Sequence, residues 1–177
     1  MTTSIEIPEK IYNNLKNHLF PRAVHPVEES AFVYAQINED DLSLTFRYSD
    51  LYLVKTGDYV TRSAYHFELK DELRGQIIKK AHDLGSSIIE FHSHVRQDSA
   101  QFSETDWLGF NEFVPHVMWR LKGKPYAAVV FADTTLDSFV WCNRNQDPIP
   151  LDYLVTGPKR IFPTNNSIRD LKWYKYE

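Results

Sequence analysis

The chain has 177 residues, of which 25% are charged, and its formal net charge is -4. These values fit one globular domain spanning 1–177 and give no sign of a nucleic-acid or membrane binder. The single cysteine, Cys142, excludes an internal disulfide and a zinc site built from several thiolates. Because no signal peptide and no apolar run of membrane-spanning length is visible, we expect a soluble cytoplasmic protein.

The first part of the chain is predicted to combine one helix with several strands. Apolar residues at helical spacing between Pro8 and Pro21 predict a short amphipathic helix, which the second proline ends. Strict alternation of apolar and polar residues predicts a half-buried strand at 42–46. Together with this one, strands are predicted at 27–37, 42–46, 51–54 and 65–69.

Two longer helices are predicted on either side of a central strand over 87–94. Asp71 is the expected N-cap of the first helix, and Gly85 is its expected stop. Ser103 is expected to begin the second helix. Pro115 should kink or split that helix, because proline lacks a backbone N–H and clashes with the preceding turn.

The chain is predicted to close with a hairpin of two strands, 126–132 and 136–142. The tail from Pro148 onward contains many turn signals and the aromatic residues Trp173, Tyr174 and Tyr176, and we expect it to pack back on the domain. These elements predict an α/β (α+β) sandwich with a mixed central sheet flanked by helices.

The segment that indicates chemistry is His92-Ser93-His94, followed by Ser103-x-x-Asp106. Residues two apart on a strand share a face, so the two imidazoles should point the same way. Asp106 can supply a third ligand if its helix starts above the end of that strand. Three protein ligands leave the fourth position of a zinc ion for water, as in catalytic sites. The sequence therefore predicts one Zn²⁺ per chain.

A hydrolytic site also needs a base and a donor for the developing oxyanion. Glu28, at the start of the first long strand, is the candidate base, whereas Glu29 should point to the opposite face. The Ser103 hydroxyl is the candidate oxyanion donor. Glu90 lies on the predicted histidine face, where its carboxylate could hold a histidine by a hydrogen bond or compete for the metal.

Each part of this set has a simpler interpretation when it is taken alone. A His-x-His pair is unremarkable in a chain with seven histidines. Ser103-x-x-Asp106 is typical of a helix N-cap with an acidic first turn, although such a cap would also orient Asp106 for a metal. Glu28 alone would be a surface carboxylate. The metal interpretation depends on the joint occurrence of these residues, in this order, on the predicted elements.

The pattern resembles the JAMM (JAB/MPN) metalloprotease family, whose signature is an upstream glutamate, then H-[ST]-H, a spacer and S-x-x-D. The segment 28–33 is similar to the E-x-x-G and apolar strand of that family, with Ala31 in place of the usual glycine. Val95 replaces a proline, the spacer 95–102 is slightly long, and Glu90 replaces an uncharged residue. The resemblance implies a JAB/MPN-like, cytidine-deaminase-like fold.

Carried over by position, the resemblance implies zinc ligands at His92, His94 and Asp106, a general base at Glu28 and an oxyanion partner at Ser103. It also implies a zinc (iso)peptidase that cleaves at the C-terminus of a ubiquitin-like protein or of its conjugate. The likeness to prokaryotic members suggests a stand-alone bacterial enzyme. Such an enzyme would work beside activating and conjugating enzymes in antiviral defence.

Two alternatives stay open at this point. One is a non-catalytic MPN-type scaffold, and the other is a peptidase that processes the precursor of a ubiquitin-like sulfur carrier. A nucleobase deaminase and an H-E-x-x-H zincin are excluded because their ligand patterns are absent. The segments 50–65 and 95–102 are the expected substrate contacts, with the substrate tail paired along a strand edge.

Overall fold

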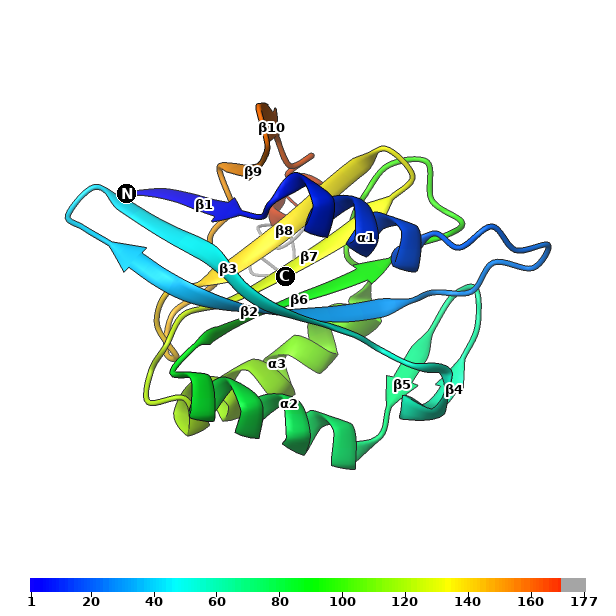
Figure 1. The fold of residues 1–177 in the computed structure, drawn as a ribbon, viewed down its shortest axis with the longest axis horizontal. Coiled ribbons are helices and arrows are strands. Elements are labelled where there is room, and N and C mark those ends of the chain that lie inside the picture. The colour runs from blue at the N-terminus through cyan, green and yellow to red at the C-terminus, as the bar shows by residue number, and fades with distance from the viewer. Residues whose placement is uncertain (170–177) are drawn as a thin grey trace.

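The computed structural model describes residues 1–169 and shows a large mixed sheet with helices on both of its faces (Figure 1). The strands lie in the order β10 (Lys159–Ile161), β9 (Tyr153–Thr156), β1 (Thr2–Glu6), β3 (Ser43–Leu53), β2 (Ser30–Glu39), β6 (Ser87–Ser93), β7 (Tyr126–Ala132) and β8 (Thr135–Trp141). β1 pairs in parallel with β3 and β9, and β6 pairs in parallel with β7. The other neighbouring strands are antiparallel, so the predicted mixed sheet is confirmed.

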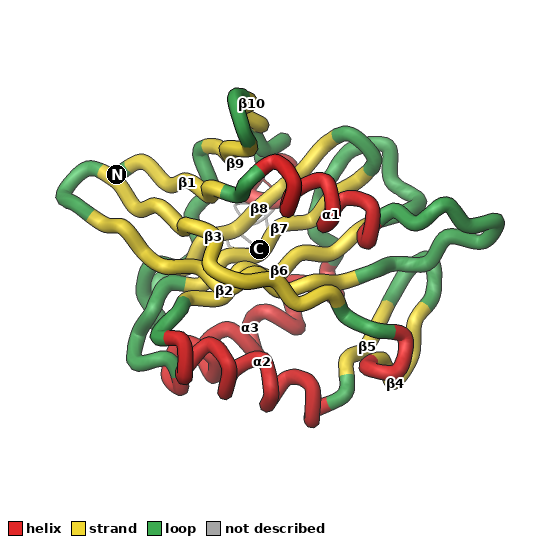
Figure 2. The backbone as a smooth tube through the Cα atoms, viewed as in Figure 1, coloured by secondary structure: helices red, strands yellow, loops and turns green. Residues whose placement is uncertain are grey.

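The helices form layers on the two faces of this sheet (Figure 2). One face is covered by α1 (Glu9–Leu19), and the other by α2 (Asp71–Leu84) and α3 (Glu104–Arg120). A short 3₁₀ helix, η1 (Thr56–Asp58), leads into a separate hairpin of β4 (Tyr59–Arg62) and β5 (Phe67–Leu69). This hairpin lies beside the start of α2, at one end of the large sheet (Figure 1).

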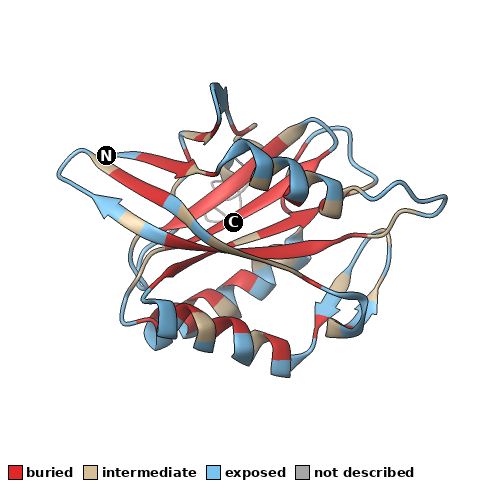
Figure 3. Cartoon of the chain, viewed as in Figure 1, coloured by how far each residue is buried: buried red, intermediate tan, exposed pale blue. Residues whose placement is uncertain are grey.

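Buried apolar side chains form one core on each face of the sheet. Buried residues make up most of its central strands (Figure 3). Ile89 and Phe91 of β6 pack in the core that α1 covers, whereas Ile88 packs in the core beneath α2 and α3. Since side chains alternate along a strand, Glu90 and His92 lie on the same side as Ile88. The hydrophobic pattern of β6 therefore determines which face receives the histidine.

The predicted helices agree with the structure apart from one cap and one proline. The N-cap of α2 is Lys70 and not Asp71, whose exposed carboxylate instead lies 4.0 Å from Arg74. Gly85 ends α2 in the left-handed conformation, with φ of 60°, as expected for a glycine stop.

The proline at position 115 does not split α3, which runs unbroken past it. The carbonyl that loses its hydrogen-bond partner belongs to Asn111, which is exposed and can be hydrated. Val114 and Val117 on either side are buried. Their burial holds the helix together where the local hydrogen bond is missing.

The strand predictions were incomplete for β3 and for the edge of the large sheet beside it. The pieces at 42–46 and 51–54 belong to one strand, β3, which has an irregularity opposite Tyr34/Ala35. Strands β1, β4, β9 and β10 were not predicted. In β1 the polar Thr3 and Ser4 are buried, so this strand lacks a hydrophobic alternation. The tail from Pro148 does return to the sheet, as β9 and β10, while Trp173, Tyr174 and Tyr176 lie outside the described residues. None of the helices within 1–169 is both long and apolar enough to cross a membrane.

Candidate metal centre

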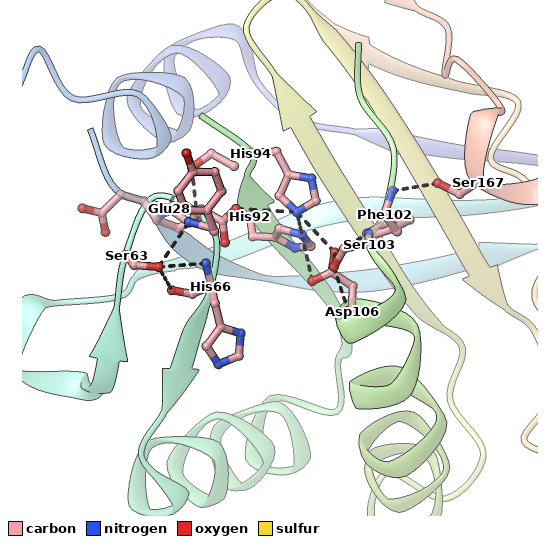
Figure 4. A network of polar contacts seen from close by, with 12 residues as sticks. Glu28, Ser63, His66, His92, His94, Phe102, Ser103, Asp106 and Ser167 are labelled. Atoms are coloured by element: carbon pink, nitrogen blue, oxygen red, sulfur yellow. Dashed lines mark hydrogen bonds and ion pairs between the residues drawn. The ribbon is translucent and has the colours of Figure 1, made fainter. Parts of the chain in front are cut away.

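Two histidine rings meet at the end of β6 (Figure 4). His92 lies in β6, and His94 follows the strand, where its backbone N–H donates to the carbonyl of Phe131 on β7 at 2.8 Å. This bond continues the strand pairing by one more residue and keeps both rings on one side. Their Nε2 atoms are 3.3 Å apart. Both residues are buried, with 1% and 4% of their surface exposed.

Asp106 reaches the histidine pair from the first turn of α3. Its Oδ1 lies 3.5 Å from Nε2 of His92, and its Oδ2 lies 3.2 Å from Nε2 of His94. The three residues each offer a ligand atom, and these atoms all lie within 4.8 Å of one another. The structure therefore brings together the three side chains that the sequence predicted as ligands.

The separations between these atoms fit a small divalent ion. Four ligands placed tetrahedrally at about 2.0–2.1 Å from an ion lie about 3.3 Å from each other. The two Nε2 atoms are 3.3 Å apart, and they lie 3.5 and 3.2 Å from different oxygens of Asp106, Oδ1 and Oδ2. Two imidazole nitrogens and one carboxylate are also a ligand set that zinc accepts, with a position left for water. A buried His92–His94–Asp106 group that can hold a metal ion is thus present.

Asp106 is oriented by a reciprocal capping box with Ser103. The Ser103 backbone N–H and hydroxyl both donate to Asp106 Oδ2 at 2.7 Å, and the Asp106 N–H donates to Ser103 Oγ at 3.1 Å. These bonds immobilise the carboxylate through Oδ2 and leave Oδ1 without a hydrogen bond from the cap. The Ser103 hydroxyl donates to Asp106 in this state, so service as an oxyanion donor requires it to rotate away.

Glu28 lies next to this group but outside the strand to which it was assigned. It precedes β2 by two residues, is 6% exposed, and places Oε1 3.9 Å from Nε2 of His94. Its backbone N–H donates to the carbonyl of Ser63, which precedes β5, at 2.8 Å (Figure 4). The Glu29 carboxylate instead accepts hydrogen bonds from Arg62 and Tyr59. Sequence reasoning missed this link to 59–69, because no periodicity pairs these segments.

The charges of the group stabilise one another. Burial lowers the pKa of His92, but the nearby carboxylates of Asp106, Glu90 and Glu28 outweigh it, so that pKa is raised. Burial raises the pKa of Asp106, but the charges and hydrogen bonds of His92 and His94 hold it well below its usual range. Burial raises the pKa of Glu28, against the opposing effect of the two histidines. A metal ion would displace protons from the histidines, so its affinity should fall as the pH falls.

Glu90 does not hold either histidine by a hydrogen bond. Its Oε2 accepts from the Tyr126 hydroxyl at 2.5 Å, and burial raises the pKa of this carboxyl group. The Nδ1 atoms of His92 and His94 are buried and have no hydrogen-bond partner among residues 1–169. Glu90 also lies outside the group of three that can share an ion. Glu90 therefore does not serve as the hydrogen-bond partner of a histidine, a role that the sequence allowed.

A cavity of about 200 Å³ opens beside these residues. Glu28, Glu90, Ser103 and Asp106 form part of its wall, and segment 65–69 forms another part. The expected contact segment 50–65 contributes only its last residue, and the spacer 95–102 contributes none. The spacer is instead tied to the end of the described chain, because the Phe102 N–H donates to Ser167 Oγ at 2.8 Å (Figure 4).

Comparison with models of known protein families and with curated proteins finds no match. The functional interpretation of the site therefore depends on its geometry and on the sequence pattern that led to it.

Proposed function

We propose that this chain is a zinc-dependent peptidase or isopeptidase of the JAMM type. The observation that carries the proposal is the meeting of three potential ligand atoms within 4.8 Å of one another, with the Glu28 carboxylate 3.9 Å from Nε2 of His94. A purely structural zinc site would use four protein ligands, whereas the group described above provides three, of which Asp106 lines a cavity.

The arrangement of the elements is compatible with a JAB/MPN-like fold, which we propose on the basis of the motif resemblance. His92 and His94 sit at the end of β6, a central strand of a mixed sheet. Asp106 lies in the first turn of the next helix, α3, and one helix covers the opposite face. The order of motif strand, spacer and capped helix is the order that the family signature requires.

A zinc ion held by His92, His94 and Asp106 would acidify a water molecule and polarise the carbonyl of the scissile bond. Glu28 then accepts the proton of the attacking water and later delivers it to the leaving nitrogen. The burial of this carboxylate supports such a role, because it keeps the proton away from bulk water. The Ser103 hydroxyl, once turned from Asp106, donates to the oxygen on which negative charge develops.

The proposed substrate is the C-terminal tail of a ubiquitin-like protein, joined to a partner through a peptide or isopeptide bond. This substrate class comes from the resemblance to JAMM proteases. The open cavity beside Glu28 and Asp106 supports it, since an extended chain needs access to these residues. Activating and conjugating enzymes for the same ubiquitin-like protein are the proposed partners in the cell.

The test is a zinc measurement combined with a cleavage assay. The purified protein should contain one zinc ion per chain and should cleave linear fusions or lysine-linked conjugates of candidate ubiquitin-like proteins. A chelator should abolish cleavage, and added zinc should restore it. A metal-free protein whose cleavage activity a chelator leaves unchanged would sink the proposal. Zinc without cleavage of any such substrate would favour the scaffold, and cleavage of linear fusions alone would favour precursor processing.

A further inference from the structure

The residue next to Glu28, Glu29, belongs to a buried polar network. Glu29 is 7% exposed, and its carboxylate accepts hydrogen bonds from Arg62 Nη1 at 2.5 Å and from the Tyr59 hydroxyl at 3.1 Å. The Tyr59 hydroxyl in turn accepts from the backbone N–H of Ser30 at 2.9 Å. Glu29 thus joins β4 to the start of β2 through a buried ion pair and a shared hydroxyl.

The backbone of the same segment is bonded on two sides. The Glu28 N–H donates to Ser63 at 2.8 Å, which links it to the stretch between β4 and β5. The Glu29 N–H donates to Ser93 Oγ, and the Ser93 N–H donates to the Glu29 carbonyl, both at 3.0 Å. Ser93 stands between His92 and His94. The segment 28–30 is therefore held between the strand that bears the histidines and the β4–β5 hairpin.

The Glu28 side chain has little to hold it on its own. Within residues 1–169 its carboxylate makes no hydrogen bond, and its Oε1 lies 3.9 Å from Nε2 of His94, which is longer than a hydrogen bond. Its position is consequently decided by the backbone of 28–30. A displacement of about 1 Å in a reacting group can lower a rate about 10²-fold, so the hold on this backbone matters for catalysis.

We infer that Glu29 is a positioning residue, which keeps Glu28 at its working distance from His94 by clamping segment 28–30 to Arg62 and Tyr59. This inference rests on the proposed function, because it assigns Glu28 the role of the base. Glu29 does not touch the ligand group, so its removal should change the placement of Glu28 and leave the metal in place.

The first experiment measures zinc content, kcat and KM for Glu29→Ala. We expect zinc to stay at about one ion per chain, KM to change by less than about 3-fold and kcat to fall roughly 10²-fold. Glu29→Gln, which keeps an acceptor for Tyr59 or Arg62, should recover most of the rate. The matched control is Asp58→Ala. The Asp58 carboxylate accepts from the Tyr52 hydroxyl at 2.8 Å just before the same hairpin, but it does not hydrogen-bond to segment 28–30. The Asp58→Ala variant should therefore have a kcat close to that of the parent protein.

A double variant separates positioning from general damage. If Glu29 acts only through Glu28, then Glu28→Ala combined with Glu29→Ala should be no slower than Glu28→Ala alone. A further loss in the double variant would overturn the inference, as would loss of zinc from Glu29→Ala or an unchanged kcat. Should Glu29→Ala fail to fold, Tyr59→Phe removes the bridging hydroxyl while keeping the ring, and the same outcomes apply to it.

Amide hydrogen exchange tests the clamp without any activity. In Glu29→Ala, exchange at the Glu28 and Ser63 amides should rise at least about 10-fold, while exchange at the His94 amide should stay unchanged. Equal exchange in variant and parent would overturn the clamp even if the protein proves to be a protease. Conversely, a protein without hydrolase activity but with the predicted exchange would refute the proposed function and leave the clamp standing.

Discussion

The ligand side and the Glu28 side of the candidate metal centre are assembled in different ways. His92, His94 and Asp106 come from β6 and α3, which follow one another in the sequence. Glu28 arrives from the segment before β2, where Glu29 and Ser93 meet across 64 residues of chain. The ligand side is organised by strand alternation and a capping box, and the Glu28 side by long-range contacts with the β4–β5 hairpin.

This difference suggests that metal binding and turnover can be altered separately. The capping box orients Asp106 through Ser103 alone, without help from the hairpin. The placement of Glu28 depends on Ser63 in one direction and on Ser93, through its neighbour, in the other. Loss of a ligand residue should therefore remove the metal, whereas changes on the Glu28 side should slow the reaction with the metal retained.

The largest effect is expected from loss of a ligand. His92→Ala or Asp106→Ala leaves two protein ligands, so zinc should fall below about 0.1 ion per chain and cleavage should drop to the uncatalysed background. Elemental analysis of the purified variants and a cleavage assay measure both. His82→Ala is the control, because His82 lies on the exposed side of α2 and pairs with Asp83. If a ligand variant keeps its full zinc content, the substituted residue is not a metal ligand.

Glu28→Ala should have the next largest effect, and only on turnover. Zinc should remain at about one ion per chain, while kcat should fall about 10²–10⁴-fold, the usual contribution of a general base. Parallel zinc and kinetic measurements check this, with Glu28→Gln as the variant of equal shape. If Glu28→Ala cleaves at the parental rate, the base must be sought elsewhere. Glu90 would then be the next candidate, because it lines the cavity and Glu29 does not.

Ser103→Ala distinguishes a capping residue from an oxyanion donor. If Ser103 only caps α3, its loss should lower the free energy of unfolding by about 1 kcal/mol with little effect on the rate. If it also donates to the oxyanion, as proposed, kcat should fall about 10²–10³-fold as well. Urea unfolding and steady-state kinetics measure the two quantities. Ser103→Thr keeps the hydroxyl and should stay close to the parent in both; a kcat unchanged in Ser103→Ala would contradict the oxyanion role.

The same contrast explains which parts of the site could be predicted from the sequence. The helix cap at Ser103 and the shared face of His92 and His94 follow from local rules, so the meeting of these side chains with Asp106 could be predicted from spacing. The hold on Glu28 could not be foreseen, because a hydrogen bond to Ser63 has no periodic signature. The polar strand β1 and the strands of the tail were missed because their burial is decided by neighbours distant in sequence.

Tyr126→Phe is expected to have the smallest effect, and it tests whether Glu90 belongs functionally to the ligand side. Removal of the hydroxyl leaves Glu90 Oε2 without its 2.5 Å donor, so the free energy of unfolding should fall by about 1–3 kcal/mol. Tyr34→Phe is the matched control. The Tyr34 hydroxyl is buried without a hydrogen-bond partner in the described residues, so its loss should cost nothing.

Zinc content is the deciding measurement for Tyr126→Phe. Glu90 lies two residues before His92 on the same face of β6, yet outside the group of ligand atoms. If it takes no part in metal binding, the released carboxylate should leave zinc at about one ion per chain. A changed zinc affinity in Tyr126→Phe but not in Tyr34→Phe would show that Tyr126 keeps a competing carboxylate away from the metal. The ligand side would then depend on β7 as well as on β6 and α3.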